Sequence, residues 1–469
     1  MMGAKIEKGT CKVRVFRYDP SKDEKPRYET YEVPYLVERA PDGREIPMRI
    51  MAVLDYIRNE LGVDIAYRAT CGIGRCGTCG VLVNGEPKLA CWDAAEREMT
   101  IEPLPNLPII RDLVVDRRPL EEQLKNVNPW LERKKPYTKF PEEFRPEEIP
   151  VLKDVFKLGR CLECGLCYAS CPLVERSPYV GPEAITHLTK FTFDPRDKQE
   201  DRLTIALSKG AYYCTTCKRC SEACPMEIDP LNALISLRGL LVEAGKVPST
   251  IRDALERIYK YGNPWGISRS KRSEWARNLK IKYASQVEKI ELLYFVGCAA
   301  SYDLRAQNVA KAIAKNLNTL GIDFTILGNE ENCCGNEVYS LGERGLFEIL
   351  VEENLNIFRK YGVDKIVTTS PHCFNAFKNR YGNHKLTVLH YTQFFADLID
   401  KGKLKFSKKI EKKVTYQDPC FLARYNNILD EPRKIIESIP GVTFLELRMS
   451  GKHGICCGGG GGRMWYEIP

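Results

Sequence analysis

Nineteen of the twenty cysteines fall into four groups whose spacings are typical of metal-cluster ligands. The first group reads C-x4-C-x2-C with a more distant fourth cysteine, and the next two read C-x2-C-x2-C-x3-C-P. The last is a repeated pattern that ends in two adjacent cysteines and a glycine. In chain order the groups are Cys71, Cys76, Cys79 and Cys91; Cys161, Cys164, Cys167 and Cys171; Cys214, Cys217, Cys220 and Cys224; and Cys298, Cys333, Cys334, Cys373, Cys420, Cys456 and Cys457. Cysteines two or three residues apart converge on a metal more readily than they pair across a fold, so metal ligation constrains each region of the chain.

The spacings indicate iron–sulfur clusters. The first group has the plant-ferredoxin spacing of a [2Fe–2S] centre, and the C-x2-C-x2-C-x3-C-P runs are those of paired [4Fe–4S] centres. In such pairs the fourth cysteine of each run binds the other cluster. We therefore predict one [4Fe–4S] centre on Cys161, Cys164, Cys167 and Cys224, and a second on Cys214, Cys217, Cys220 and Cys171. Structural zinc also uses C-x2-C pairs, but the triplets with a trailing Cys-Pro disfavour it.

Glycines accompany the cysteines where the backbone must bend tightly around inorganic sulfide. Gly72, Gly74, Gly77 and Gly80 satisfy a G-x-G-x-x-G pattern. A dinucleotide site would need a strand before and a helix after this pattern, whereas here ligand cysteines lie inside the loop. The nucleotide interpretation is therefore rejected. Cys11, the remaining cysteine, is expected to be a small buried hydrophobe.

Composition limits the partners. No apolar run approaches the roughly 18 residues of a membrane span, and the charged amino terminus lacks the apolar core of a secretory signal. These features predict a cytoplasmic protein that reaches the inner face of the cell membrane only peripherally, through a partner subunit. The formal net charge is +9, but four thiolate-bound clusters would contribute roughly −8. Nucleic acid is therefore not expected as a partner.

Hydrophobic periodicity divides the chain into regions. Residues 12–18 and 29–36 alternate as a hairpin and precede a helical stretch over 49–61. Residues 231–244 predict an amphipathic helix that stops at Gly245. From residue 288 strands and helices alternate, at 292–296, 304–320, 324–327, 346–360 and 365–369.

We predict an α+β multidomain protein with four parts. These are a β-grasp [2Fe–2S] ferredoxin domain over 1–115, an extended Pro-rich connector over 116–150, an α-helical domain with two [4Fe–4S] clusters over 151–280, and an α/β cysteine-rich repeat over 288–469.

The last region contains an internal repeat. Cys298 precedes the pair Cys333–Cys334 by 35 residues, and Cys420 precedes Cys456 of the second pair by 36. A closing cysteine, Cys373, follows the first pair, so the second copy should close near about position 496, beyond the last residue. We expect that the chain is truncated; the alternative is that another subunit completes the second site.

These residues resemble known families. The run from Cys71 to Cys224 resembles the iron–sulfur subunit of succinate dehydrogenases and fumarate reductases, except that Cys217 stands where that family usually lacks a cysteine and holds a [3Fe–4S] centre. The last region resembles the cysteine-rich (CCG) domains of heterodisulfide reductases and of glycolate oxidase iron–sulfur subunits. The fusion of the two resembles the B subunit family of archaeal thiol:fumarate reductases.

The resemblance implies ligands for the CCG repeat. Heterodisulfide reductases use five cysteines per CCG domain to hold a noncubane cluster, whereas the first copy here offers four, Cys298, Cys333, Cys334 and Cys373. Four ligands suit an ordinary [4Fe–4S] cubane. Disulfide chemistry, and any noncubane cluster, would then belong to Cys420, Cys456 and Cys457 as catalytic residues. His372 and His453 are candidate proton carriers, although a hydrogen-bonding or surface role is the more common one for such histidines.

Three functions follow from the resemblance. The first is an electron-transferring subunit that connects an FAD flavoprotein acting on fumarate or succinate with coenzyme M and coenzyme B thiols. The second passes electrons from a flavoprotein that oxidises succinate, glycolate or lactate to a membrane quinone. The third is a non-enzymatic electron-transfer protein.

Overall fold

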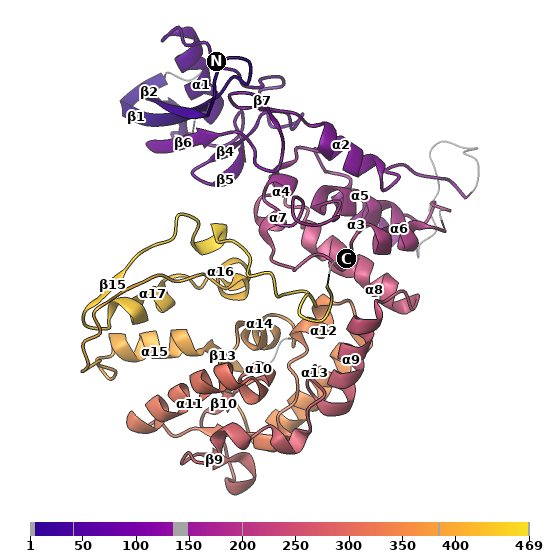
Figure 1. Ribbon diagram of the computed structural model, residues 1–469, viewed down its shortest axis with the longest axis vertical. Helices are drawn as coiled ribbons and strands as arrows, with labels where there is room; N and C mark the ends of the chain where they lie inside the picture. The colour runs from indigo at the N-terminus through magenta and orange to yellow at the C-terminus, as the bar shows by residue number, and fades with distance from the viewer. Residues whose placement is uncertain (1–4, 41, 135–148, 199, 383–384, 468–469) are drawn as a thin grey trace. The chain divides into compact units, whose positions relative to one another are not determined.

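The computed structural model describes residues 5–40, 42–134, 149–198, 200–382 and 385–467. The chain divides into two compact units (Figure 1). The first unit comprises Met1–Ala211 and Lys218–Leu237, and the second comprises Tyr212–Cys217 and Arg238–Pro469. The second cysteine-proline motif is therefore divided, because Cys214 and Cys217 belong to the second unit.

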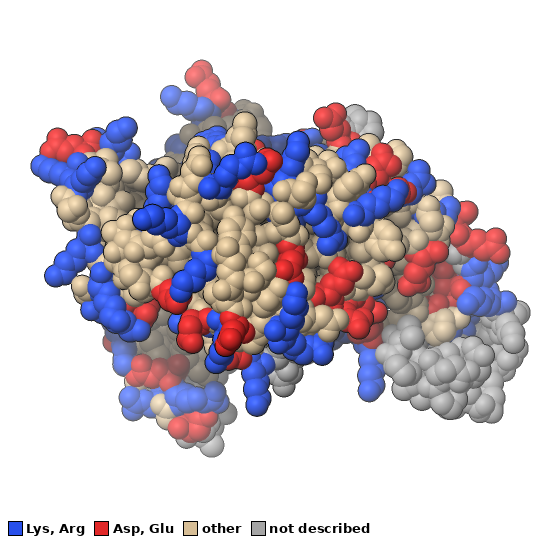
Figure 2. All heavy atoms as spheres, turned by 90° about the horizontal axis from the view of Figure 1, so that it is seen from below, with Lys and Arg blue, Asp and Glu red and all other residues tan. Residues whose placement is uncertain are grey.

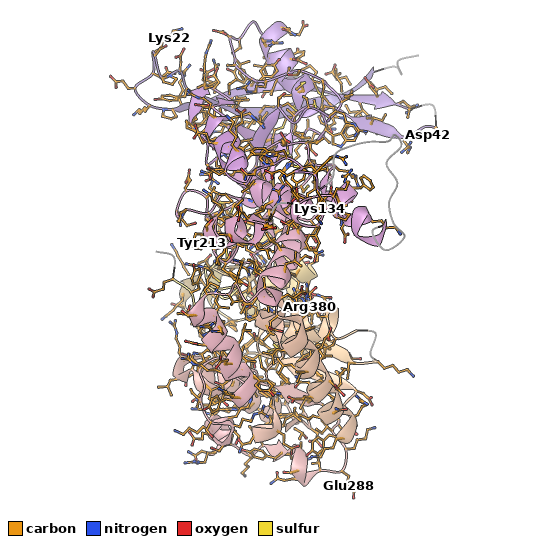
Figure 3. The ribbon with its side chains drawn as sticks, turned by 90° about the vertical axis from the view of Figure 1, so that its right-hand side faces the viewer. Lys22, Asp42, Lys134, Tyr213, Glu288 and Arg380 are labelled. Atoms are coloured by element: carbon orange, nitrogen blue, oxygen red, sulfur yellow. The ribbon has the colours of Figure 1, made fainter. Side chains whose placement is uncertain are left out.

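The first unit begins with the predicted hairpin. Strands β1 (Lys5–Arg17) and β2 (Arg27–Arg39) pair antiparallel, and Lys22 lies at their turn (Figure 3). Cys11, Val13 and Val15 of β1 are fully buried, which agrees with the alternation in the sequence and with the prediction for Cys11.

This hairpin is part of a mixed sheet. In the described part of the chain the sheet has six strands in the order β3-β2-β1-β6-β4-β5, with β6 parallel to β1. Its other strands are β3 (Glu45–Pro47), β4 (Gly80–Val83), β5 (Glu86–Leu89) and β6 (Glu98–Glu102). Helix α1 (Ile50–Asn59) contributes Val53, Leu54 and Ile57 to the same core. The sheet-plus-helix layout agrees with the prediction, and the β-grasp assignment stays a prediction.

The predicted extended connector is partly wrong. After the small hairpin β7 (Ile109–Arg111) and β8 (Val114–Val115), helix α2 (Arg118–Lys125) forms within it. Its Pro occupies the first turn, where a missing N–H costs the helix nothing, and Leu120 is buried. Residues 135–148 of the connector lie outside the described part of the chain.

Helices dominate the next region, as predicted. They are α3 (Ile149–Leu158), α4 (Leu166–Ala169), α5 (Pro182–Thr192), α6 (Arg202–Ser208), α7 (Arg219–Glu222), α8 (Pro230–Glu243) and α9 (Ser249–Tyr261). Helix α8 is confirmed, and Gly245 follows it with φ +66°. The predicted amphipathic character of α8 is wrong, because most of its residues on every side are buried or half-buried.

The second unit contains a parallel sheet in the order β13-β12-β10-β11-β9. Its strands are β9 (Lys282–Tyr283), β10 (Leu293–Phe295), β11 (Thr325–Ile326), β12 (Lys365–Thr368) and β13 (Thr387–His390). The alternating helices are α10 (Cys298–Tyr302), α11 (Leu304–Thr319), α12 (Asn336–Ser340), α13 (Arg344–Lys360), α14 (Pro371–Asn379) and α15 (Tyr391–Asp400). All of β10 is buried, as expected of a parallel strand covered on both faces. The predicted α/β alternation is confirmed.

The second copy of the repeat is smaller. Strands β14 (Lys412–Val414) and β15 (Val442–Phe444) pair parallel, with α16 (Cys420–Asn426) and α17 (Asp430–Glu437) between them. Helix α16 begins at Cys420 as α10 begins at Cys298. Short 3₁₀ turns lie at Arg269–Lys271, Glu274–Ala276, Ala284–Gln286, Gly328–Glu330 and Gly451–His453.

Two observations concern the predicted partners, namely the charged side chains on one face and the length and apolar character of the helices. On the face shown in Figure 2, basic and acidic side chains are interspersed. Among the described helices, none combines the length and the apolar character needed to cross a bilayer.

A buried histidine should make the second unit sensitive to acid. Burial lowers the pKa of His390 from 6.5 to about 4, and its ring bonds to Thr369 and Thr392. Because the unfolded chain binds the proton more tightly, this contribution to stability is complete above about pH 6.5 and is lost as the pH falls toward about 4. At pH 5 the loss amounts to about 2 kcal/mol. Denaturant unfolding of His390→Gln, which keeps the N–H donor, should lack this difference between pH 8 and pH 5; an unchanged pH dependence would refute it.

Candidate iron–sulfur sites

The first cysteine group surrounds a loop that donates backbone hydrogen bonds to sulfur. The Sγ of Cys71 accepts the N–H groups of Arg75 and Cys76 at 3.3 and 3.4 Å. Backbone donors, with Ile73 first, lower the pKa of Cys71 to about 6. The loop therefore favours the thiolate, which is the form that binds iron.

The other cysteines of this loop lie close by. The Sγ atoms of Cys79 and Cys91 are 3.3 Å apart, and Cys91 Sγ accepts the N–H of Gly74 at 3.3 Å. Burial raises the pKa of Cys79 to about 12. A bound metal removes such a proton outright, so a buried thiol of this kind fits a metal ligand.

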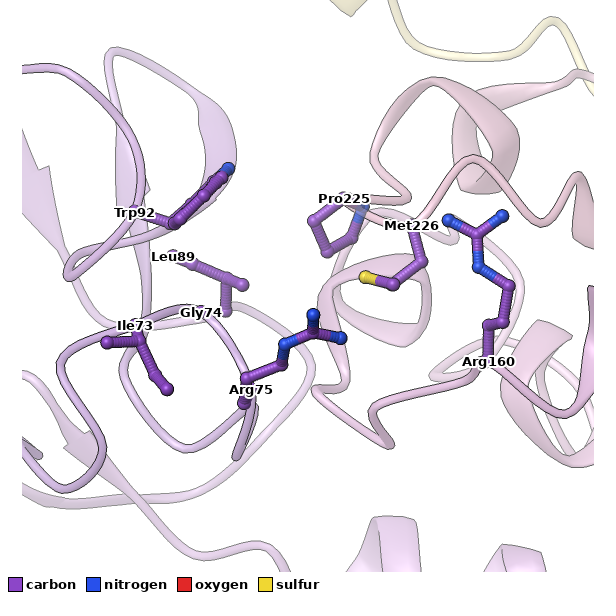
Figure 4. Close-up of a pocket in the computed structure, with 8 residues that line it drawn as sticks. All are labelled: Ile73, Gly74, Arg75, Leu89, Trp92, Arg160, Pro225 and Met226. Carbon is purple, nitrogen blue, oxygen red and sulfur yellow. The ribbon is translucent and has the colours of Figure 1, made fainter.

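A cavity of about 650 Å³ borders this loop (Figure 4). It is lined by Ile73, Gly74, Arg75, Leu89, Trp92, Arg160, Pro225 and Met226. Arg75 extends from the loop toward Met226 (Figure 4). Ile73 and Trp92 are 61% and 52% exposed. The loop therefore presents two large apolar side chains to solvent beside the candidate ligand cysteines.

The loop that carries the first cysteine group lies in close contact with the first cysteine-proline motif. Gly77 has φ +70°, and a Cβ there would lie 2.6 Å from the carbonyl oxygen of Leu162 and 2.9 Å from Cα of Cys164. The guanidinium of Arg117 donates to the carbonyl oxygens of Gly77 and Cys164 at 3.5 and 3.4 Å. Only glycine allows this approach, which places the first two cysteine groups side by side.

Four cysteines line one cavity. Three belong to the first cysteine-proline motif and the fourth belongs to the second motif, which is the arrangement that the predicted exchange of a ligand requires. The cavity is lined by Cys161, Cys164, Cys167 and Cys224 together with apolar residues such as Met226 and Ile228. Burial raises the pKa values of Cys161 and Cys164 to about 12. Four convergent thiols in an apolar cavity fit a [4Fe–4S] cluster, and the assignment of iron stays a prediction.

A buried carboxyl faces this cavity. Glu183, on α5, lines the cavity, is 2% exposed and accepts the N–H of Gly165 at 3.1 Å. Burial raises the pKa of Glu183 to about 7, although Arg117 lowers it. Nothing in the sequence marks Glu183 beyond its place as an acid in the first turn of a helix, which is common.

The two cysteine-proline motifs share their backbone conformation. Glu163 and Thr216, at equivalent positions, have φ 51° and 53°, and Gly165 and Lys218 have φ 74° and 67°. Left-handed angles at residues other than glycine are uncommon, so both motifs wrap their ligands in the same way. In the second predicted quartet Cys171 and Cys220 belong to the first unit while Cys214 and Cys217 belong to the second. That quartet stays a prediction.

The first CCG copy brings together its four predicted ligands. Side-chain hydrogen bonds link Cys298 to Cys333, and link Cys334 to Cys333 and to Cys373. Gly297 has φ +83°, and a Cβ there would lie 3.0 Å from Cys373 Sγ. The four thiols therefore converge at the amino-terminal end of α10.

A buried ion pair supports this site and was not apparent from the sequence. Arg272 Nη2 lies 2.9 Å from Glu331 Oε1 and 3.5 Å from Cys298 Sγ. Glu331 accepts the N–H groups of Val296 and Gly297, both at 2.9 Å. Because these partners satisfy the buried carboxylate, the pair fixes the backbone that carries Cys298.

The second CCG copy places its cysteines beside the second cysteine-proline motif. Cys420 begins α16, and Cys456 Sγ lies 3.3 Å from Thr215 Oγ1. Burial raises the pKa of Cys420 to about 12, whereas Cys457 is exposed.

The two candidate histidines differ in position. His372 Nε2 is 3.7 Å from Glu337 Oε1, and its ring packs edge-on against Phe421, next to Cys420. His453 is exposed within a 3₁₀ turn. The placement of His372 is the one that suits a role at the second copy.

Among the described residues no group of three or more His, Cys, Asp or Glu side chains is arranged to hold a single metal ion. The preference for iron over zinc stays a prediction from the spacing of the cysteines.

Known families match the three regions. Residues 12–122 match a family described as a 2Fe-2S iron-sulfur cluster binding domain, and residues 157–228 match a 4Fe-4S dicluster domain. Residues 292–378 and 414–468 match a family described as a cysteine-rich domain. The interrupted last match coincides with the two copies of the internal repeat.

Whole-chain comparisons agree with this division. The chain is 34% identical to the B subunit of fumarate reductase (CoM/CoB) from Methanothermobacter marburgensis, over 96% of this chain and 86% of that protein. It is 32% identical to EtfAB:quinone oxidoreductase of Syntrophomonas wolfei, over 67% of this chain and 49% of that protein. A crystal structure of a hypothetical protein from Helicobacter pylori superposes with a TM-score of 0.54 at 11% identity, over 95% of this chain and 80% of that one, and so shares the fold.

The close approach at Gly77 can be tested against a matched glycine. Gly62 has φ +68° with nothing near its position, whereas Gly77 at φ +70° meets main-chain atoms. Gly62→Ala should therefore cost only the left-handed backbone, about 1–2 kcal/mol. Gly77→Ala should cost about 1–3 kcal/mol more through overpacking. Anaerobic denaturant unfolding measures both values, and equal losses would contradict the contact between the two cysteine groups.

Proposed function

Because this chain belongs to the family of iron–sulfur subunits that includes the B subunit of CoM/CoB fumarate reductase, we propose that it carries electrons between a flavoprotein and a thiol–disulfide site. The chain is an iron–sulfur electron-transfer subunit of an oxidoreductase complex. The finer proposal is that the flavoprotein contains FAD and acts on fumarate or succinate, and that coenzyme M and coenzyme B are the thiols.

The observation that carries the proposal is the placement of four cysteine groups in one chain. Gly77 holds the first group against the second, and Cys456 of the last group lies at Thr215 of the third. Iron–sulfur clusters bound there would accept and release one electron at a time. Adjoining cysteine groups within each unit support steps of electron transfer rather than isolated structural metals.

We assign ligands from the sequence and the cavity geometry. The [2Fe–2S] centre takes the first group, and the two [4Fe–4S] centres take the quartets with exchanged fourth cysteines. A further [4Fe–4S] centre takes Cys298, Cys333, Cys334 and Cys373. Cys420, Cys456 and Cys457 would handle the thiols. Their burial and raised pKa values keep Cys420 and Cys456 protonated until a metal or substrate arrives.

The cavity beside the [2Fe–2S] loop is the proposed contact face for the flavoprotein. Ile73 and Trp92 are exposed beside ligand cysteines, and Arg49 lies over the Trp92 ring at 5.5 Å. A rigid aromatic side chain with apolar neighbours is typical of the centre of a protein interface. Arg75 and Arg160 at its border would favour an acidic partner surface.

A quinone is the second candidate acceptor, because the chain also resembles an EtfAB:quinone oxidoreductase. In that case membrane contact would come through a partner subunit.

A donor assay separates the two candidates. The complex with its flavoprotein should reduce fumarate with coenzyme M and coenzyme B thiols, and Cys420→Ser should abolish thiol-dependent turnover while artificial one-electron donors still support it. The control is Cys11→Ala, because Cys11 is fully buried and its place in the sequence lies outside the four cysteine groups. Turnover with reduced quinone but not with thiols would overturn the thiol proposal and support the alternative.

The cluster assignment has its own test. Anaerobically purified protein should contain about 14 irons if all four centres assemble. Cys217→Ser should remove one four-iron signal from the EPR spectrum and leave the [2Fe–2S] signal. Stoichiometric zinc with little iron, or a Cys217→Ser spectrum identical to that of the unmodified protein, would contradict the assignment.

A further inference from the structure

The loop Cys214–Cys217 is held by main-chain contacts within the second unit. Tyr425 Oη donates to the carbonyl oxygen of Thr216 at 2.7 Å. Two glycines of the second CCG copy press on the same loop: a Cβ at Gly460 would lie 2.6 Å from Thr215 O, and one at Gly461 would lie 2.5 Å from Cys214 O. Thr215, Thr216 and Cys217 of this loop are therefore buried.

Two arginines donate to the ligand residues themselves. Arg238 Nη2 donates to the carbonyl oxygen of Cys214 at 2.8 Å, and Arg424 Nε donates to that of Cys217 at 2.5 Å. Arg238 is 0% exposed and Arg424 is 3% exposed. Each is anchored elsewhere by carbonyl oxygens: Arg238 by Ser340 at 2.8 Å, and Arg424 by Lys452 and Gly454 at 3.0 and 2.7 Å.

The charge on these arginines is permanent. A guanidinium does not lose its proton in a protein, and its interaction with another charge strengthens as water is excluded. Reduction adds one negative charge to an iron–sulfur cluster, and nearby charge and hydrogen bonding set the reduction potential. A fixed positive charge bonded to the ligand residue therefore stabilises the reduced state.

We propose that Arg238 and Arg424 raise the reduction potential of the [4Fe–4S] centre bound through Cys214 and Cys217, so that it is the more oxidising of the two centres of the cysteine-proline motifs. This inference rests on the proposed function. At the other quartet the guanidinium of Arg117 also reaches a ligand residue, at 3.4 Å from the carbonyl oxygen of Cys164, but the buried carboxyl of Glu183, which lines that cavity, opposes its charge. The more oxidising centre would thus be the one beside Cys456 of the second CCG copy.

The experiment is an EPR-monitored redox titration of the anaerobically purified full-length chain. Cys217→Ser identifies which four-iron signal belongs to this centre. In the unmodified protein that signal should have the higher midpoint potential of the two cysteine-proline centres. The reverse order would overturn the proposal without any arginine variant.

Substitutions of the two arginines distinguish an effect of their charge from a purely structural role. Arg238→Gln and Arg424→Gln keep an N–H donor but remove the charge, whereas the corresponding Lys variants keep the charge. At a fixed potential, each Gln variant should have a ratio of reduced to oxidised centre about tenfold lower than that of the unmodified protein, which is equivalent to about 59 mV for one electron. In each Lys variant this ratio should stay within about threefold of the unmodified value. Arg433→Gln, which removes a guanidinium bonded to Asp418 and Glu446, is the control and should change nothing.

Each remaining outcome has a distinct meaning. Unchanged potentials in Gln variants with full iron content, or equal shifts in the Gln and Lys variants, would overturn the proposal and leave a purely structural role. Zinc in place of iron would overturn the proposed function instead. If the Gln variants bind no iron, the order of the two midpoints in the unmodified protein decides.

Discussion

The structure depends on the convergence of thiols, most of which burial disfavours in ionised form, with Cys71 as an exception. Burial keeps the pKa values of cysteines such as Cys79, Cys164 and Cys420 high, so their sulfurs gather as neutral groups in apolar surroundings. Bound iron replaces these protons, and the free energy of binding becomes free energy of folding. In the first unit Cys79, Cys91 and Cys164 belong to a large hydrophobic core, so packing and metal binding stabilise the same loops.

Much of the fold was evident in the sequence because local patterns determine it. The hairpin β1–β2, helix α1 and the α/β alternation of the second unit follow from periodicity. Helix α2 was missed because prolines elsewhere in the connector suggested extended chain, although a proline in the first turn is compatible with a helix. The amphipathic prediction for helix α8 failed at Arg238, which is fully buried and donates to the carbonyl oxygens of Ser340 and Cys214, both distant in sequence.

The residues of the candidate sites also divide into those that the sequence predicts and those that it does not. The spacing of the cysteines predicts candidate ligands because metal chemistry fixes that spacing, and the structure places Cys224 with Cys161 in one cavity, as the predicted exchange of a fourth cysteine requires. The roles of Glu183, Arg238 and Glu331 could not be predicted from the sequence. Each of these buried charged groups contacts residues that lie tens or hundreds of positions away in the chain. These charges distinguish the sites: a carboxyl lines one cavity, while guanidinium groups hold the ligand loop of another motif.

The close approach at Gly77 affects the rate of electron transfer between the first two cysteine groups. Where it meets the carbonyl oxygen of Leu162 and the Cα and Cβ atoms of Cys164, no side chain larger than hydrogen fits between the two segments. Tunnelling rates fall steeply with the gap that an electron must cross. A close contact between two backbone segments at this point keeps that gap short.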